Sequence, residues 1–267
     1  MGIYAVNGKE PVAAWIPSLD TAGNGTTTLT DLVGSNDGTL TNMVAGSDWV
    51  ADTDAGGVRA LDFDGSNDKV VAPNFSVTGA TATLSIWMKR RSVKGLDGVL
   101  TNHDTRNISN RLLSIFCQGT ICVFNIGNGT ATNTISASIG SSWTHVVGVR
   151  NGATMQLWLN GVLAASRTDA FATDFPTLTQ PWVLGQFANS WAFDGLLDAA
   201  YVFDPALDSS DIAYLYNSGT GRGIVASSGA PAQNAQHNNL RNIRMAPLAT
   251  STNRRPSTST LSASSGQ

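Results

Sequence analysis

Glutamate is nearly absent from this chain, and that absence narrows the chemistry available to it. Glu10 is the single glutamate, and the other 18 of the 19 acidic residues are aspartates. Glycosidases need two carboxyl groups beside the scissile bond, so an aspartate pair such as Asp62 and Asp64 is the remaining route to glycan cleavage. The three histidines show no triad spacing, and we interpret His145 as a half-buried side chain bonded to neighbouring backbone. We therefore expect no enzyme.

Long apolar runs and cysteines are also scarce. Residues 1–10 contain no basic region followed by an apolar stretch, and no later run is long enough to span a membrane. We therefore expect neither a secretory signal nor a membrane anchor. Cys117 and Cys122 bracket four residues in an apparent hairpin, where a disulfide requires Cα atoms within roughly 7 Å. Cysteine pairs without a secretory context more often remain thiols, so both states stay open.

The chain is rich in short strand-like segments separated by turn residues. In the stretch 143–166, Asn151-Gly152 and Asn160-Gly161 separate three apolar runs, and Asn-Gly is a strong hairpin signal because both residues tolerate positive φ. Many strands at short spacing predict a sandwich or barrel. The predicted strands are Val12–Ile16, Ala60–Phe63, Lys69–Ala72, Thr83–Lys89, Arg111–Phe116, Ile121–Ile126, Trp143–Arg150, Thr154–Leu159, Trp182–Gln186 and Asp194–Phe203.

One short helix is predicted at Asp208–Tyr216. Asp208 or Ser209 can cap it, and Ile212 and Leu215 contribute to an apolar stripe at helical spacing. We divide the chain into an N-terminal segment (1–10), one all-β domain (11–220) and a low-complexity C-terminal arm (221–267).

Six segments in a fixed order carry a family resemblance. They are Val12–Trp15, Asp31–Leu40, Leu61–Val70, Thr83–Lys89, the stretch 143–166, and Gly185–Phe203 followed by Ala206-Leu207 and Asp211–Tyr216. In this order they resemble the laminin G-like members of the concanavalin A-like lectin and glucanase family, over roughly residues 10 to 217. The resemblance implies an antiparallel two-sheet jelly-roll sandwich with a concave face and loops at one rim. It implies no activity, because this scaffold carries lectins, hydrolases, lyases and adhesion modules.

The resemblance also implies a structural calcium ion as a possible cofactor. Several members of the wider fold bind calcium through backbone carbonyls and an aspartate of a late strand, and Asp198 stands at the matching position. Ala199 follows where the family often has glutamate, which departs from the pattern. The segment Asp62–Asp68 looks like the start of a calcium loop but lacks the closing bidentate glutamate, since Pro73 occupies that position. We interpret it as a strand, a tight turn and the next strand.

Tryptophans outside strands are candidate sugar platforms, because sugar rings stack their apolar faces on exposed aromatic rings. Trp191 lies in a connection between two predicted strands, beside Asn189 and Ser190. We predict a glycan site at Trp191 and Asn189, against the alternative that Trp191 anchors its loop over the sandwich edge. Trp87, Trp143 and Trp158 lie within predicted strands and are assigned to the core.

Residues 221–267 differ from the rest in composition. They hold five of the 16 basic residues and none of the 19 acidic ones, so this arm carries +5 and the preceding part −8. With few large apolar residues, it cannot order itself by burial, and we expect it to gain order on another subunit. Arginines without interleaved aromatics give little reason to expect nucleic acid. The predicted partner-binding residues are Leu240, Arg241, Ile243, Arg244, Met245 and Leu248.

These observations lead to one hypothesis and two alternatives. A lectin-like domain without an export signal, joined to an arm that orders in an assembly, is typical of a bacteriophage virion protein. We expect a decoration, fibre or adsorption module that is assembled in the host cytoplasm, is homo-oligomeric and binds a cell-surface glycan. The alternatives are a free extracellular carbohydrate-binding or adhesion module, and a glycan-cleaving enzyme.

Overall fold

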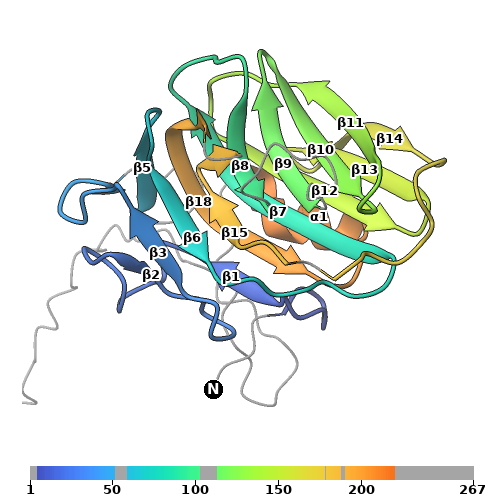
Figure 1. Ribbon diagram of the computed structural model, residues 1–267, viewed down its shortest axis with the longest axis horizontal. Coiled ribbons are helices and arrows are strands. Elements are labelled where there is room, and N and C mark those ends of the chain that lie inside the picture. The colour runs from blue at the N-terminus through green and yellow to red at the C-terminus, as the bar shows by residue number, and fades with distance from the viewer. Residues whose placement is uncertain (1–4, 52–58, 103–112, 178, 188–189, 220–267) are drawn as a thin grey trace, which may run out of the picture. The chain divides into compact units, whose positions relative to one another are not determined.

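The computed structural model describes residues 5–51, 59–102, 113–177, 179–187 and 190–219 (Figure 1). These residues form strands and one α-helix, which ends in a short 3-10 turn at Asn217–Gly219. The elements are β1 (Ala13–Trp15), β2 (Thr28–Leu29), β3 (Gly38–Thr41), β4 (Trp49–Val50), β5 (Ala60–Asp64), β6 (Lys69–Ala72), β7 (Thr81–Arg90), β8 (Asp97–Thr101), β9 (Leu113–Gln118), β10 (Ile121–Gly127), β11 (Thr132–Ser138), β12 (Thr144–Asn151), β13 (Thr154–Leu159), β14 (Val162–Arg167), β15 (Trp182–Leu184), β16 (Gln186–Phe187), β17 (Trp191–Ala192), β18 (Asp194–Phe203) and α1 (Ser209–Tyr216).

Within the described residues, the strands form two antiparallel eight-stranded sheets and one small hairpin. The first sheet has the order β14-β13-β12-β7-β18-β5-β4, with β1 also paired to β18. The second has the order β11-β10-β9-β8-β15-β6-β3-β2, and β16 pairs with β17 separately. The predicted all-β, two-sheet jelly-roll sandwich is confirmed. The predicted C-terminal arm lies outside the described residues.

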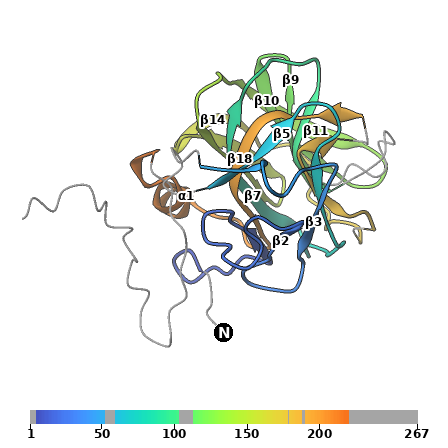
Figure 2. The ribbon, with the colours of Figure 1, turned by 90° about the vertical axis from the view of Figure 1, so that its left-hand side faces the viewer.

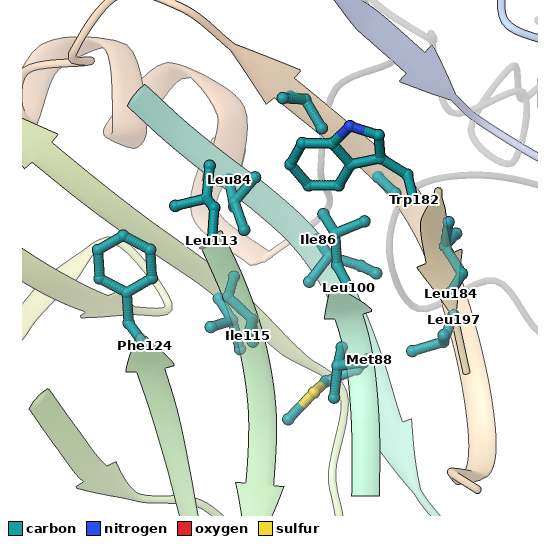
Figure 3. Close-up of a cluster of buried hydrophobic side chains, with 14 of the residues drawn as sticks. Leu84, Ile86, Met88, Leu100, Leu113, Ile115, Phe124, Trp182, Leu184 and Leu197 are labelled. Atoms are coloured by element: carbon teal, nitrogen blue, oxygen red, sulfur yellow. The ribbon is translucent and has the colours of Figure 1, made fainter. Parts of the chain in front are cut away.

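The main core lies between the two sheets. Alternate residues of β7, Leu84, Ile86 and Met88, point inward and are fully buried, as are Leu113 and Ile115 on β9 (Figure 3). Residues two apart on a strand share one face, so this alternation sets the register of both sheets. Each such side chain contributes about 1.5–3 kcal/mol through burial.

A second apolar cluster covers the outer face of the first sheet. Trp87, Val147, Tyr201 and Phe203 point away from the main core and pack against Ile212 and Leu215 of α1. Figure 2 shows α1 outside the sandwich, beside β7 and β18. Asp208 caps α1 by accepting hydrogen bonds from the backbone N–H groups of Ser210 and Asp211, as predicted for this position. No helix in the described part of the chain is long and apolar enough to cross a membrane.

The two Asn-Gly turns have different outcomes. Leu159 pairs with Val162, so Asn160 and Gly161 form the two-residue turn between β13 and β14, with φ of 52° and 75°. That prediction is confirmed, since positive φ at both positions defines a type I′ turn. The predicted turn at Asn151-Gly152 is wrong by one residue. Asn151 still pairs with Thr154 in the ladder, and the turn uses Gly152 and Ala153.

Several strand predictions need correction. The predicted strand Trp182–Gln186 is broken at Gly185, whose φ of 81° ends β15 before β16 begins. Trp191 does not lie in an irregular connection, because it pairs with Phe187 in the β16–β17 hairpin. Trp143 immediately precedes β12 and is partly buried. The strands that sequence patterns did not identify are β2, β3, β4, β8, β11 and β17.

Candidate functional site

A cavity of about 460 Å³ lies where three turns of the sandwich meet the β16–β17 hairpin. The turn after β5 contributes Gly65, the turn after β7 contributes Lys94, and β9 contributes its last residue, Gln118. Trp191 closes the cavity from the hairpin side, which brings together segments far apart in sequence. The complete lining is Gly65, Lys94, Gly95, Leu96, Gln118, Ser190, Trp191 and Ala192.

Trp191 is held by a small aromatic cluster on the outer face of the second sheet. Its ring centroid lies 5.4 Å from that of Phe187, and the ring of Phe187 lies 5.0 Å from that of Phe116. Phe116, Val123 and Phe187 are buried together, and Trp191 packs on them while remaining partly exposed. The indole is therefore both anchored to the sheet and available to the cavity, so the two interpretations of this residue are compatible.

The hairpin lies directly against the sheet at Gly98. A Cβ atom at this position would lie 2.1 Å from the carbonyl carbon of Gln186, closer than any side chain could be accommodated. The hydroxyl of Thr101 donates to the Gln186 carbonyl oxygen at 3.2 Å. Close approach of two backbones requires glycine. Gly98 therefore lets the β16–β17 hairpin, which carries Trp191, pack directly on β8.

Lys94 joins the walls of the cavity. Its ammonium group donates to the carbonyl oxygen of Gly65 and, at 3.3 Å, to that of Ala192. Gly65 has a φ of 78°, which glycine adopts without strain. Among the described residues, the ion pairs found do not include Lys94. Its two acceptors are uncharged carbonyls at the edge of the cavity.

The carboxylates near this rim are engaged in ion pairs. Arg91 binds both Asp62 and Asp194, the latter at 2.8 Å, beside a second cavity of about 350 Å³. Arg90 lies 2.9 Å from Asp97, and both side chains are buried between the sheets. Burial raises the pKa of Asp97, and the hydrogen bond from Arg90 opposes that rise. These carboxylates tie strands together.

Asp62 and Asp64, the aspartate pair considered for glycan cleavage, have different partners, since Asp62 binds Arg91. Asp64 accepts hydrogen bonds within its own turn, chiefly from the backbone of Ser66, and these lower its pKa. Asp68 closes the same turn by accepting from the backbone N–H of Asp64, while burial raises the pKa of Asp68. Asp64 and Asp68 therefore stabilise the tight turn between β5 and β6 that the sequence predicted.

Asp198, the predicted calcium ligand, lies at a bulge in β18. The register against β7 shifts between Asp198 and Tyr201, and Ala199 adopts a φ of 45°. The carboxylate accepts from the N–H of Ala199 at 2.7 Å and from the hydroxyl of Ser18 at 3.4 Å. It is 2% exposed, and burial raises its pKa to about 7.

Calcium takes six to eight oxygen ligands, of which Asp198 supplies one carboxylate. In the described part of the chain, no three acidic, histidine or cysteine side chains gather closely enough to hold a metal ion. The buried negative charge suits a cation, but the remaining ligands would have to be carbonyls and water. Calcium at Asp198 stays a prediction.

His145 is buried under α1. Its Nε2 atom lies 2.9 Å from the hydroxyl of Ser85, and its ring stacks on Trp87 at 5.1 Å and on Tyr216 at 6.2 Å. Burial lowers its pKa to about 3, so the imidazole is neutral at physiological pH. The predicted half-buried, backbone-bonded histidine is wrong, because the second apolar cluster covers the ring completely.

Other predicted site residues lie outside the described residues. They are Asn189 of the glycan site and the partner-binding residues Leu240, Arg241, Ile243, Arg244, Met245 and Leu248. Sequence analysis did not identify Lys94 and Gln118. One signal was present for Lys94, because residues 89–94 contain four basic side chains in a domain that is otherwise acidic.

The family follows from comparison with known proteins. The model of the concanavalin A-like lectin/glucanases superfamily matches residues 64–213, more than half of the chain. The chain therefore belongs to this superfamily, as its sequence resemblance predicted. No curated protein sequence matches it.

Several solved structures with the same fold are toxin binding domains. The binding domain of Paraclostridial Mosquitocidal Protein 1 has 16% identity and a TM-score of 0.59, with 80% of this chain and 53% of that chain covered. The botulinum neurotoxin serotype D binding domain has 14% identity and a TM-score of 0.58, with 79% and 52% covered. The serotype D ligand binding domain in complex with N-acetylneuraminic acid has 13% identity and a TM-score of 0.56, with 78% and 50% covered. The present chain thus spans about half of each neighbour, and the likeness establishes the fold.

Proposed function

We propose that this domain is a non-catalytic, lectin-like module that binds a cell-surface glycan in the cavity beside Trp191. The observation that carries the proposal is one aromatic ring, braced by Phe187, in a cavity shared with Lys94 and Gln118. A sugar can stack its C–H face on an indole while polar groups bind its hydroxyls. Several solved neighbours with this fold are binding domains, which supports a binding role.

The charge of Lys94 favours an acidic sugar. Its ammonium is bonded to two neutral carbonyls, so a sugar carboxylate at the cavity would form a charge-assisted hydrogen bond. N-acetylneuraminic acid, which the serotype D ligand binding domain binds, is a sugar of this type. We include it as the first ligand to test.

We further propose that residues 221–267 attach the domain to a larger assembly, with a bacteriophage virion as the leading setting. The support is the composition of this arm, which carries five arginines, no acid and few large apolar residues. Such a segment orders by binding rather than by burying its own core. The domain would then face outward as an adsorption or decoration module and form homo-oligomers through the assembly.

Glycan-array binding of the full chain and of Trp191→Ala tests the sugar site. Removing the ring should weaken binding at least about tenfold, since stacking and burial are together worth more than about 1.4 kcal/mol. Val162→Ala is a matched control, because Val162 is 68% exposed on β14, in the first sheet. Unchanged binding by a folded Trp191→Ala protein would exclude this cavity, and polysaccharide turnover by the wild type would favour the enzyme.

A truncation that ends at Thr220 tests the arm. It should keep glycan binding and thermal stability while losing incorporation into particles. Full-length protein that stays monomeric and enters no particle would instead favour the free binding module.

A further inference from the structure

The β9–β10 hairpin carries two thiols at one position of its ladder. Cys117 and Cys122 are direct partners in the antiparallel register, and the neighbouring pair, Gln118 and Ile121, flanks the turn. Gly119 and Thr120 form that two-residue turn, with Gly119 at a φ of 57°. The structure holds both cysteines as free, buried thiols.

The geometry of this pair suits a covalent bond. Antiparallel ladders alternate hydrogen-bonded and non-hydrogen-bonded pairs, and the residues that flank a two-residue turn form a hydrogen-bonded pair. Cys117 and Cys122 therefore form the next, non-hydrogen-bonded pair, in which Cα atoms lie about 4.5 Å apart, within the range of roughly 4.4–6.8 Å found for disulfides. Both side chains point into the main core with Ile115 and Phe124, so neither has to change face.

We propose that Cys117 and Cys122 form an intra-hairpin disulfide by exchange with a low-molecular-weight disulfide such as oxidised glutathione. One cysteine thiolate attacks a sulfur of the small disulfide and releases one small thiol. The second thiolate then attacks the resulting mixed disulfide and releases the other small thiol. The two protein sulfurs lose two electrons, which reduce the small disulfide, and the two thiol protons leave on the released thiols.

The surroundings of the pair determine when this exchange occurs. The hydrogen bond from Cys117 and the burial of the thiol raise the pKa of Cys122, while the nearby Arg90 guanidinium lowers it by a smaller amount. Arg90 donates to the Gly119 carbonyl oxygen and to Asp97, so the charges that face the pair are already matched. Exchange is therefore slow in the closed hairpin and proceeds during folding or local opening, when the thiols reach solvent.

The bond would act on the platform of the cavity. Phe116 and Val123, next to the two cysteines, carry the ring of Phe187 beneath Trp191, and Gln118 lines the cavity. Locking this hairpin would hold that platform rigid in an oxidising environment. This consequence rests on the proposed function, whereas formation of the bond does not.

The test uses the full chain, incubated with oxidised glutathione in sub-denaturing urea at mildly alkaline pH. We expect peptide mapping to show Cys117 joined to Cys122 with the loss of two hydrogen atoms. We also expect the melting temperature to rise by about 4–8 °C, the shift for closing so short a loop in a domain of this size, and reductant to reverse the rise. Cys117→Ser and Cys122→Ser are matched controls that should show no reductant-sensitive shift.

Three results would overturn the proposal. The thiols could remain fully titratable after denaturation of the treated protein, the cross-link could join separate molecules, or the oxidised hairpin could melt at a lower temperature. A glycan array run on the oxidised and reduced forms reports separately on the cavity, so a failed sugar site would leave the disulfide result intact.

Discussion

Replacing Asp198 by asparagine should stabilise the protein at neutral and alkaline pH. Burial raises the pKa of this carboxyl from its ordinary 3.8 to about 7. The folded state therefore binds the proton more tightly than the unfolded chain, and stability falls as pH rises between these two values. Below about pH 4 the group is neutral in both states. Above about pH 7 the folded state bears the full free-energy cost of burying the ionised carboxylate.

The size of the effect follows from the shift. Three pKa units correspond to about 4 kcal/mol, at about 1.4 kcal/mol for each unit. Asparagine has nearly the same shape as aspartate and can keep the hydrogen bond from the Ala199 N–H, but it cannot ionise. Urea denaturation should thus give Asp198→Asn a free energy of unfolding several kcal/mol above wild type at about pH 8, and a similar one at about pH 4.

Calcium binding at Asp198 would give the opposite result and would refute this reasoning. A bound divalent cation would stabilise the ionised carboxylate, so wild type in calcium would be most stable at alkaline pH and would lose that stability in chelator. Asp198→Asn would then be the less stable protein. Equal unfolding curves for both proteins at every pH, with and without calcium, would show that the carboxylate is solvated and that neither account holds.

Two further perturbations test how the rim of the cavity is built. Asp97→Asn should lower the free energy of unfolding by about 3–5 kcal/mol, because it leaves the Arg90 guanidinium buried without its counter-ion. The double change Arg90→Met with Asp97→Leu should lower the free energy of unfolding by less than Asp97→Asn does. Equal losses in the two variants would contradict the ion pair. Gly98→Ala should lower stability by about 1–3 kcal/mol in urea denaturation and impair glycan binding, because its Cβ would meet the Gln186 backbone. Gly140→Ala, where a Cβ meets no atom within 4 Å, is the matched control and should be neutral in both assays.

Strand prediction succeeded where apolar alternation and turn residues agreed. Lys69–Ala72 and Thr154–Leu159 were predicted with the bounds that the structure has, since each is flanked by turn-forming residues. It failed where one of these signals was missing. β8 begins with Asp97 and Gly98 and is buried on both faces, because its acid is paired with Arg90 and its glycine lies under the hairpin. β11 is an edge strand with a single buried apolar residue, Ile135.

The candidate site was only partly predictable for a different reason. Trp191 could be chosen from sequence because it is a large aromatic among small polar neighbours. Gln118 could not, and the basic run 89–94 was the one signal for Lys94, because the cavity is made where the ends of β5, β7 and β9 meet and their proximity depends on sheet order. Local patterns report on strands and turns, whereas a cavity between turns depends on how the sheets are assembled.

The two outer faces of the sandwich differ in a way that points to one of them for binding. The face of the first sheet is closed by α1, with Ile212 and Leu215 packed over Trp87, and the neutral His145 is sealed inside that cluster. Over β9 and β10, the second sheet is covered by the two-stranded β16–β17 hairpin, which leaves Trp191 partly exposed beside a cavity. Because a ligand must reach an aromatic ring that the protein itself has not enclosed, this difference favours the hairpin face as the surface for the proposed sugar site.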